Sequence, residues 1–137
     1  ARENFRRAGM EDRITLLEGD AEEILAGLTG TWDFIFMDAA KGQYIHWLPD
    51  VLRLMKEGSV LVSDNVLQEG DIIESHYLVE RRNRTIYKRM REYLWQLTHS
   101  PVLRTSVLPL GDGAAVSVKT GEQAYETTRT IGSGEQP

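Results

Sequence analysis

The chain contains no cysteine, and only 4 of its 137 residues are proline. The lack of cysteine excludes a disulfide scaffold, a zinc finger, an iron–sulfur protein and a thiol nucleophile. No apolar run approaches the roughly 20 residues that a membrane span needs, and no signal peptide is visible. A cytoplasmic location without a membrane partner is therefore expected. A domain of this size buries about 65–70% of its unfolded surface, so a core forms without covalent staples.

Positive charge is scarce, with 16 Lys and Arg against 21 Asp and Glu and a formal net charge of −5. This balance argues against nonspecific nucleic-acid binding by the whole surface, but it allows a local basic patch. Residues 80–91 form such a patch, and on a helical projection its cations fall away from an apolar stripe through Ile86, Met90 and Tyr93. The cations are Arg81, Arg82, Arg84, Lys88, Arg89 and Arg91. They indicate either a phosphate-bearing partner or a solvated helix face.

Short apolar runs alternate with helical patterns along the chain, which predicts an α/β fold with a parallel sheet. Strands are predicted at residues 13–18, 32–37 and 59–63, and helices at 21–26, 44–55 and 79–97. Asp20 should cap the first of these helices. Two more strands, at 102–108 and 114–119, flank an Asp-Gly turn and predict an antiparallel hairpin. Pro49 should kink its helix or mark the first turn.

The two ends of the sequence differ from the middle. Residues 1–8 are typical of the last turns of a helix that Gly9 ends, and no initiator Met is present. We therefore expect the sequence to begin inside a fold, with a processed N-terminus as the alternative. Residues 120–137 are polar and nearly without core residues, which favours a disordered tail after a folded unit at 1–119.

Polar side chains follow two of the predicted buried strands. Asp38 comes directly after residues 32–37, and Asp64 and Asn65 come after residues 59–63. Ligands of open α/β sheets bind at the carboxyl ends of strands, where these side chains would converge. Three oxygen donors suit Mg²⁺ or Mn²⁺. The alternative is that the two aspartates only cap the turns that follow them.

Lys41 lies three residues after Asp38. Beside a divalent cation it could stay charged and stabilise an oxyanion, or lose its proton and act as a general base. A simple salt bridge to Asp38 is the other interpretation. These alternatives stay open on the residues alone.

The segment Phe36-Met37-Asp38-Ala39-Ala40-Lys41-Gly42-Gln43-Tyr44, followed by Ser63-Asp64-Asn65, resembles the metal-dependent class I O-methyltransferases. Catechol and caffeoyl-CoA O-methyltransferases belong to this family, and the resemblance covers residues 1–119. It implies a Rossmann-like class I methyltransferase fold, mostly parallel, with a C-terminal antiparallel hairpin.

The resemblance also implies roles for individual residues. Asp38, Asp64 and Asn65 would ligate Mg²⁺, and Lys41 would assist deprotonation of the acceptor hydroxyl. S-adenosylmethionine would be the methyl donor. Its adenine would lie against Gly19, Asp20 and Ala21, and its methionine end against Asp38, Ala39 and Ala40.

One departure from the family pattern is important. The family's glycine-rich cofactor loop and the acidic residue that holds the ribose have no counterpart in this sequence. We therefore expect the chain to be the C-terminal portion of the fold, without its N-terminal strands and helices. As 137 residues alone it is expected to be incomplete, to bind S-adenosylmethionine poorly and to be inactive.

The predicted function is thus an O-methyltransferase acting on a hydroxyl with a vicinal oxygen. The basic segment 80–91 further resembles the bacterial branch that methylates 5-hydroxyuridine in tRNA. Small catechols and coenzyme A thioesters are alternative acceptors, a homodimer is an open alternative, and residues 66–77 could form a lip over the substrate. A noncatalytic RNA-binding module that uses residues 81–91 is the alternative from another class.

Overall fold

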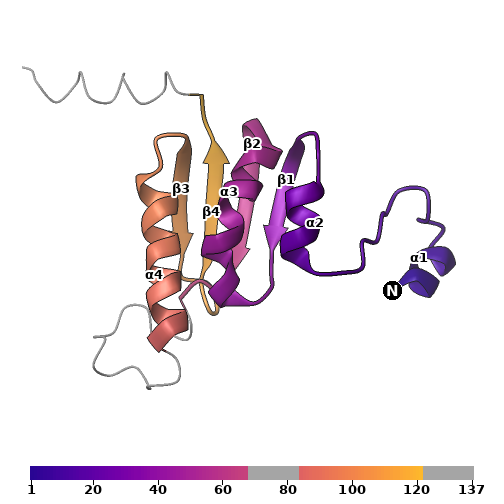
Figure 1. Cartoon of the computed structure of the whole chain (residues 1–137), viewed down its shortest axis with the longest axis horizontal. Coiled ribbons are helices and arrows are strands. Elements are labelled where there is room, and N and C mark those ends of the chain that lie inside the picture. Colours follow the sequence, from indigo (N-terminus) through magenta and orange to yellow (C-terminus); the bar gives the residue numbers. More distant parts are fainter. Residues whose placement is uncertain (68–83, 122–137) are drawn as a thin grey trace, which may run out of the picture.

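The computed structural model describes residues 1–67 and 84–121, which form a mixed sheet with helices packed against it (Figure 1). The strands are β1 (Trp32–Met37), β2 (Met55–Asp64), β3 (Leu103–Leu108) and β4 (Ala114–Lys119). The helices are α1 (Arg2–Arg7), α2 (Ala21–Gly27), α3 (Tyr44–Leu54) and α4 (Arg84–His99), with a 3₁₀ turn η1 (Lys41–Gln43). None of the helices within these ranges has the length and apolarity to span a bilayer.

The strands lie in the order β1-β2-β4-β3. β1 and β2 are parallel, β4 is antiparallel to β2, and β3 and β4 form an antiparallel hairpin. The predicted strands at 32–37, 59–63, 102–108 and 114–119 are confirmed, including the hairpin. The predicted helix at 21–26 is also confirmed, and the Asp20 carboxylate caps it by accepting the Glu22 N–H at 2.8 Å.

Three details differ from prediction. The strand predicted at 13–18 is wrong, because residues 14–18 pair with no strand among the described residues. In this part of the chain β1 is an outermost strand of the sheet. The second helix begins at Tyr44 and ends at Leu54, so Pro49 lies inside it and does not mark its first turn. Residues 79–83 of the predicted third helix, most of the predicted lip and residues 122–137 of the predicted tail lie outside the described ranges.

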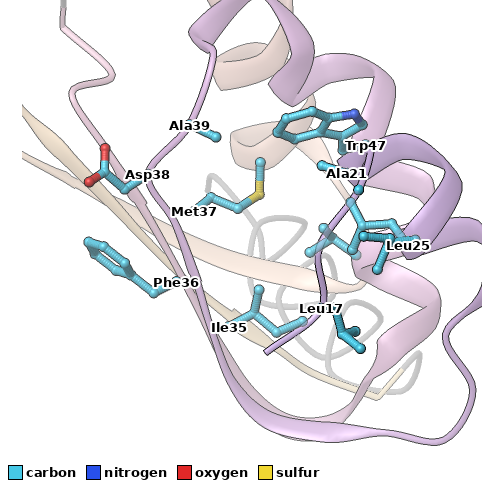
Figure 2. Close-up of a pocket in the computed structure, with 12 residues that line it drawn as sticks. Leu17, Ala21, Leu25, Ile35, Phe36, Met37, Asp38, Ala39 and Trp47 are labelled. Carbon is cyan, nitrogen blue, oxygen red and sulfur yellow. The ribbon is translucent and has the colours of Figure 1, made fainter. Parts of the chain in front are cut away.

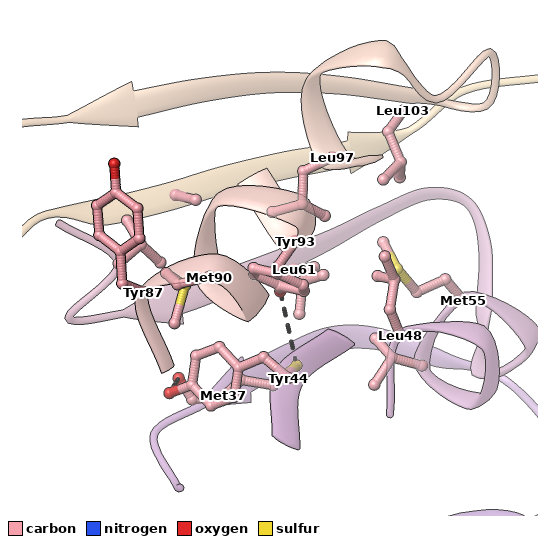
Figure 3. Close-up of a cluster of buried hydrophobic side chains, with 13 residues drawn as sticks. Met37, Tyr44, Leu48, Met55, Leu61, Tyr87, Met90, Tyr93, Leu97 and Leu103 are labelled. Carbon is pink, nitrogen blue, oxygen red and sulfur yellow. Dashed lines mark hydrogen bonds between the residues drawn. The ribbon is translucent and has the colours of Figure 1, made fainter. Parts of the chain in front are cut away.

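The core lies between one face of the sheet and helices α3 and α4 (Figures 1 and 3). Alternate residues of β1 and β2, such as Met37 and Leu61, point to this face, as the period of two in a strand requires. They meet apolar residues that recur at helical spacing. The helix residues of this cluster are Tyr44, Leu48 and Val51 from α3 and Tyr87, Met90, Tyr93 and Leu97 from α4.

The opposite face of β1 is apolar but not buried. Trp32, Phe34 and Phe36 are 50%, 58% and 55% exposed. The prediction of a buried strand at residues 32–37 is therefore wrong for this face within the described part of the chain. Their side chains alternate with those that face α3, so only half of the strand is covered by these helices. An exposed row of three large aromatic side chains is typical of a surface that packs against another element.

Leu61→Ala tests the position of the core. Leu61 is fully buried, so the substitution should lower the free energy of unfolding by about 2–5 kcal/mol. Leu110→Ala is the matched control, because Leu110 is 70% exposed and should change stability by less than about 0.5 kcal/mol. Urea denaturation followed by circular dichroism measures both values. Equal losses in the two variants would contradict this assignment of the core.

Candidate functional site

The carboxyl ends of β1 and β2 bring two aspartates to one edge of the sheet. The parallel register pairs Met37 with Ser63, Asp38 follows the last residue of β1, and Asp64 is the last residue of β2. Both carboxylates are near enough to the Tyr44 hydroxyl to act on it electrostatically. The predicted convergence of strand ends is therefore present in the structure.

Asn65 has an unusual backbone conformation, with φ of +55°. Asparagine tolerates this left-handed conformation better than most residues, and such conformations often occur at functional sites. The Asn65 N–H donates to Asp64 Oδ1 at 2.8 Å, which holds the two residues in a tight turn. This turn keeps the amide of Asn65 at the same strand end as the Asp64 carboxylate.

Burial governs the two tyrosines beneath this edge. Desolvation raises the pKa of Tyr44 above its usual value, the Ala39 N–H opposes this, and the negative charges of Asp38 and Asp64 add to the rise. Desolvation also raises the pKa of Tyr93, despite its 2.6 Å hydrogen bond with Ser63 Oγ. Figure 3 shows the Tyr93 hydroxyl directed at Met37 Sδ, 3.9 Å away. Both hydroxyls therefore stay neutral at physiological pH.

Lys41 begins η1 directly after the Asp38 strand end and is half-buried. Within residues 1–67 and 84–121, no ion pair joins Lys41 to Asp38. The salt-bridge interpretation of Lys41 therefore has no support in this structure. Its amine is available to a ligand at the end of β1.

A pocket of about 340 Å³ lies beside this edge, between β1, α2 and α3 (Figure 2). In the view of Figure 2, Trp47 and Leu25 lie on one side of it and Phe36 and Asp38 on the other. The lining residues are Leu17, Gly19, Ala21, Ile24, Leu25, Ile35, Phe36, Met37, Asp38, Ala39, Trp47 and Val51. Mostly apolar walls with a carboxylate at one end suit a flat, partly polar ligand.

Four of the six residues expected to lie against the cofactor line this pocket, namely Gly19, Ala21, Asp38 and Ala39. Asp20 and Ala40 do not line it, and one carboxylate oxygen of Asp20 caps α2. Gly19 has φ of +154°, which residues with side chains rarely adopt, and a Cβ there would lie 3.3 Å from Ile24 Cδ1. A glycine at this position lets a ligand approach the backbone closely.

The basic residues of α4 do not all face solvent. Lys88 and Arg91 are exposed, whereas Arg89 is half-buried and its Nη1 donates to the Gly42 carbonyl at 3.2 Å. The prediction of one outward-facing basic surface is therefore wrong for Arg89, because this side chain ties α4 to η1. Arg84 begins α4 and is half-buried. Arg81 and Arg82 lie outside the described residues.

Two residues gain roles that the sequence pattern did not assign. Trp47 lines the pocket, and its buried indole N–H lacks a partner among the described residues. Tyr44 stands in the motif without a predicted role, and its hydroxyl lies between the two strand ends. The signal in the sequence was its spacing of six residues from Asp38. The chain between these two residues makes one turn, η1, which brings Tyr44 back to the end of β1.

A protein-family model described as O-methyltransferase matches residues 1–120. Caffeoyl-CoA O-methyltransferase 2 of Populus trichocarpa is 30% identical over 119 residues, which cover 80% of this chain and 47% of that protein. Catechol O-methyltransferase of Mycobacterium tuberculosis is 38% identical over 74 residues, covering 53% of this chain and 34% of the relative. The chain spans about half the length of the curated relatives that cover most of it.

Solved structures give the same picture. The SAH-bound Podospora anserina methyltransferase PaMTH1 superposes with a TM-score of 0.73 at 27% identity, covering 88% of this chain and 55% of that chain. The O-methyltransferase from Bacillus cereus in complex with SAH superposes with a TM-score of 0.74 at 25% identity, covering 87% and 56%.

The raised pKa of Tyr93 predicts a loss of stability at alkaline pH. Above the ordinary value of 10.0 the unfolded chain releases the proton that the folded chain keeps. The contribution of the Tyr93 proton to the free energy of unfolding is complete below pH 10. It falls as the pH rises, by up to about 1.4 kcal/mol per pH unit. Tyr93→Phe has no such proton, so the stability gap between wild type and variant should narrow from pH 9 to 11. Urea denaturation across this range measures the gap, and a constant gap would contradict the prediction.

Proposed function

Because the chain belongs to the O-methyltransferase family, we propose that it carries the catalytic part of an S-adenosylmethionine-dependent O-methyltransferase that requires a divalent cation. The similarity to solved methyltransferases confirms the predicted α/β Rossmann-like fold, with a mixed sheet in the described part. The observation that carries the proposal is the meeting of Asp38, Asp64 and Asn65 at two parallel strand ends beside the pocket.

The donor set fits a hard cation. Two carboxylates and one amide supply only oxygen, and within the described residues no cluster of three or more His, Cys, Asp or Glu offers another site. A bound Mg²⁺ or Mn²⁺ would lower the pKa of a chelated hydroxyl and fix its orientation. Asp38, Asp64 and Asn65 would hold this ion. Acceptors with two vicinal oxygens would bind best, because both oxygens can chelate.

Lys41 is the residue best placed to handle the acceptor's proton. It follows the Asp38 strand end and is half-buried, and no ion pair within the described ranges occupies its amine. As a neutral amine it would accept the hydroxyl proton at Nζ, and as a cation it would stabilise the oxyanion. Either role places Lys41 beside the oxygen that receives the methyl group.

The pocket beside Asp38 would take part of the methyl donor. S-adenosylmethionine supplies a methyl group on a positively charged sulfur. Gly19 and Ala21 would lie against its adenine, Trp47 would form an apolar wall, and Asp38 and Ala39 would lie near its methionine end. The solved relatives described as SAH-bound support this assignment.

The remaining part of the cofactor site would come from sequence outside these 137 residues. The relatives are about twice as long as the matching region, and the chain has no glycine-rich loop of the family type. The exposed aromatic face of β1, formed by Trp32, Phe34 and Phe36, would be where that part packs. Residues 1–119 would then be the C-terminal part of the methyltransferase domain.

The acceptor we favour is 5-hydroxyuridine in tRNA, whose 5-hydroxyl and neighbouring O4 are vicinal oxygens. Helix α4 carries Lys88 and Arg91 on its exposed surface, and Arg89 ties this helix to η1 next to Lys41. Phosphates of an RNA bound along α4 would therefore lie near the catalytic edge. Small catechols and coenzyme A thioesters are the alternative acceptors.

Asp64→Ala tests the catalytic edge in the full-length protein. We expect methyl transfer to fall at least about 100-fold, since a cation ligand is lost, with an unchanged circular dichroism spectrum. Asp33→Ala is the control, because Asp33 lies at the opposite end of β1 and its carboxylate pairs with Lys56 at 2.5 Å. Transfer of radioactive methyl groups to a catechol and to tRNA containing 5-hydroxyuridine measures the activity. Full activity of Asp64→Ala, or of wild type in chelator, would refute the cation's role.

Lys88→Glu tests the tRNA acceptor. The reversal places a negative charge on the exposed face of α4, so tRNA affinity should fall and its salt dependence should weaken. Lys56→Glu makes the same change of charge on an exposed residue of β2, near Asp33, and should bind tRNA like wild type. Filter binding at several salt concentrations measures both. Equal tRNA affinity of the two variants would exclude tRNA as the acceptor and favour a small acceptor.

A further inference from the structure

The Tyr44 hydroxyl lies between the two strand ends that carry the aspartates. Tyr44 is fully buried at the start of α3, and its ring meets the ring of Tyr93 edge to face, with centroids 5.5 Å apart. Figure 3 shows both tyrosines within the core cluster beneath the sheet edge. This hydroxyl is therefore a fixed polar point inside an apolar core.

Three backbone groups surround this hydroxyl. It accepts the Ala39 N–H at 3.1 Å and donates to the Met37 carbonyl at 3.0 Å. The Asp64 carbonyl lies 3.4 Å away and is a second acceptor for the same proton. The hydroxyl thus joins the end of β1 to the end of β2 through one oxygen atom.

The two shorter bonds bracket Asp38. Met37 precedes it and Ala39 follows it, so the backbone on both sides of Asp38 is tied to one atom. When both flanking peptides are anchored, the Cα of a residue and the direction of its Cα–Cβ bond are fixed, so the Asp38 carboxylate starts from a fixed point. The contact with the Asp64 carbonyl limits the separation of the two strand ends in the same way.

From these contacts we propose that Tyr44 is a positioning residue of the cation site, which holds Asp38 and Asp64 in the relative arrangement that binds the ion. This inference rests on the proposed function, because it concerns the same site. Groups that orient metal ligands commonly change metal affinity by roughly 10- to 100-fold when they are removed. Tyr44 would act through the backbone of the ligands and would not touch the ion.

Tyr44→Phe removes the hydroxyl and keeps the buried ring. The Ala39 N–H and the Met37 carbonyl then lose their shared partner, and the Asp38 turn is released. Tyr93→Phe is the matched control. It also removes a buried tyrosine hydroxyl, but one bonded to the Ser63 and Met37 side chains and not to the strand-end backbone.

The measurement is the binding of Mn²⁺ alone to the full-length protein, followed by the electron paramagnetic resonance signal of the free ion. Circular dichroism and thermal melts without metal first establish that both variants fold. We expect Tyr44→Phe to bind Mn²⁺ at least about 10-fold more weakly than wild type, and Tyr93→Phe to stay within about 3-fold. Mn²⁺ should raise the midpoint of thermal unfolding less in Tyr44→Phe than in wild type, and equally in Tyr93→Phe and wild type.

Two outcomes overturn the inference in distinguishable ways. If wild type binds Mn²⁺ and Tyr44→Phe binds it as tightly as Tyr93→Phe does, Tyr44 is only a core residue and the proposed cation site still stands. If wild type itself does not bind Mn²⁺, the cation site and the role of Tyr44 both fail. If Tyr44→Phe does not fold, Ala39→Pro serves in its place, because it removes the N–H that donates to the Tyr44 hydroxyl. Unchanged Mn²⁺ affinity in that variant refutes the role of this hydrogen bond in positioning Asp38.

Discussion

The parallel pairing of β1 with β2 is the constraint on which the site depends. Its register sets Met37 beside Ser63, so Asp38 and Asp64 leave the sheet as neighbours. Two like charges at one edge repel each other, and a cation bound between them would relieve this repulsion. The core beneath enforces the arrangement, because Met37 and Leu61 on the same strands are buried against α3 and α4. Packing on one side of the sheet therefore creates the electrostatics at its end.

The polar groups near this edge are arranged in layers. The carboxylates and the Asn65 amide are outermost, where a ligand can reach them, and Lys41 lies beside them in η1. The hydroxyls of Tyr44 and Tyr93 lie beneath and remain neutral, since burial raises the pKa of both. Arg89 links η1 to α4 by donating to the Gly42 carbonyl.

Much of this was predictable from local sequence. Apolar runs ending in Asp38 and Asp64, the Asp20 cap and the turn at Asp112-Gly113 each carry a local signal, and the structure has all of them. The prediction of a strand at residues 13–18 was wrong because a strand requires a partner, and pairing is not a local property. The prediction of a buried strand was wrong for Phe34 and Phe36 for a similar reason, since apolar composition does not reveal which face of a strand is covered. The roles of Tyr44, Trp47 and Arg89 depend on contacts between distant segments, which spacing alone does not specify.

The proposed cation site joins Asp38, Asp64 and Asn65 at the end of the parallel strand pair. Anomalous X-ray scattering from a crystal of the full-length protein soaked in Mn²⁺ tests it most directly. We expect one strong peak about 2.0–2.3 Å from a carboxylate oxygen of each aspartate and from the Asn65 amide oxygen. A structure with no peak at this edge, or with the ion held by other residues, would contradict it.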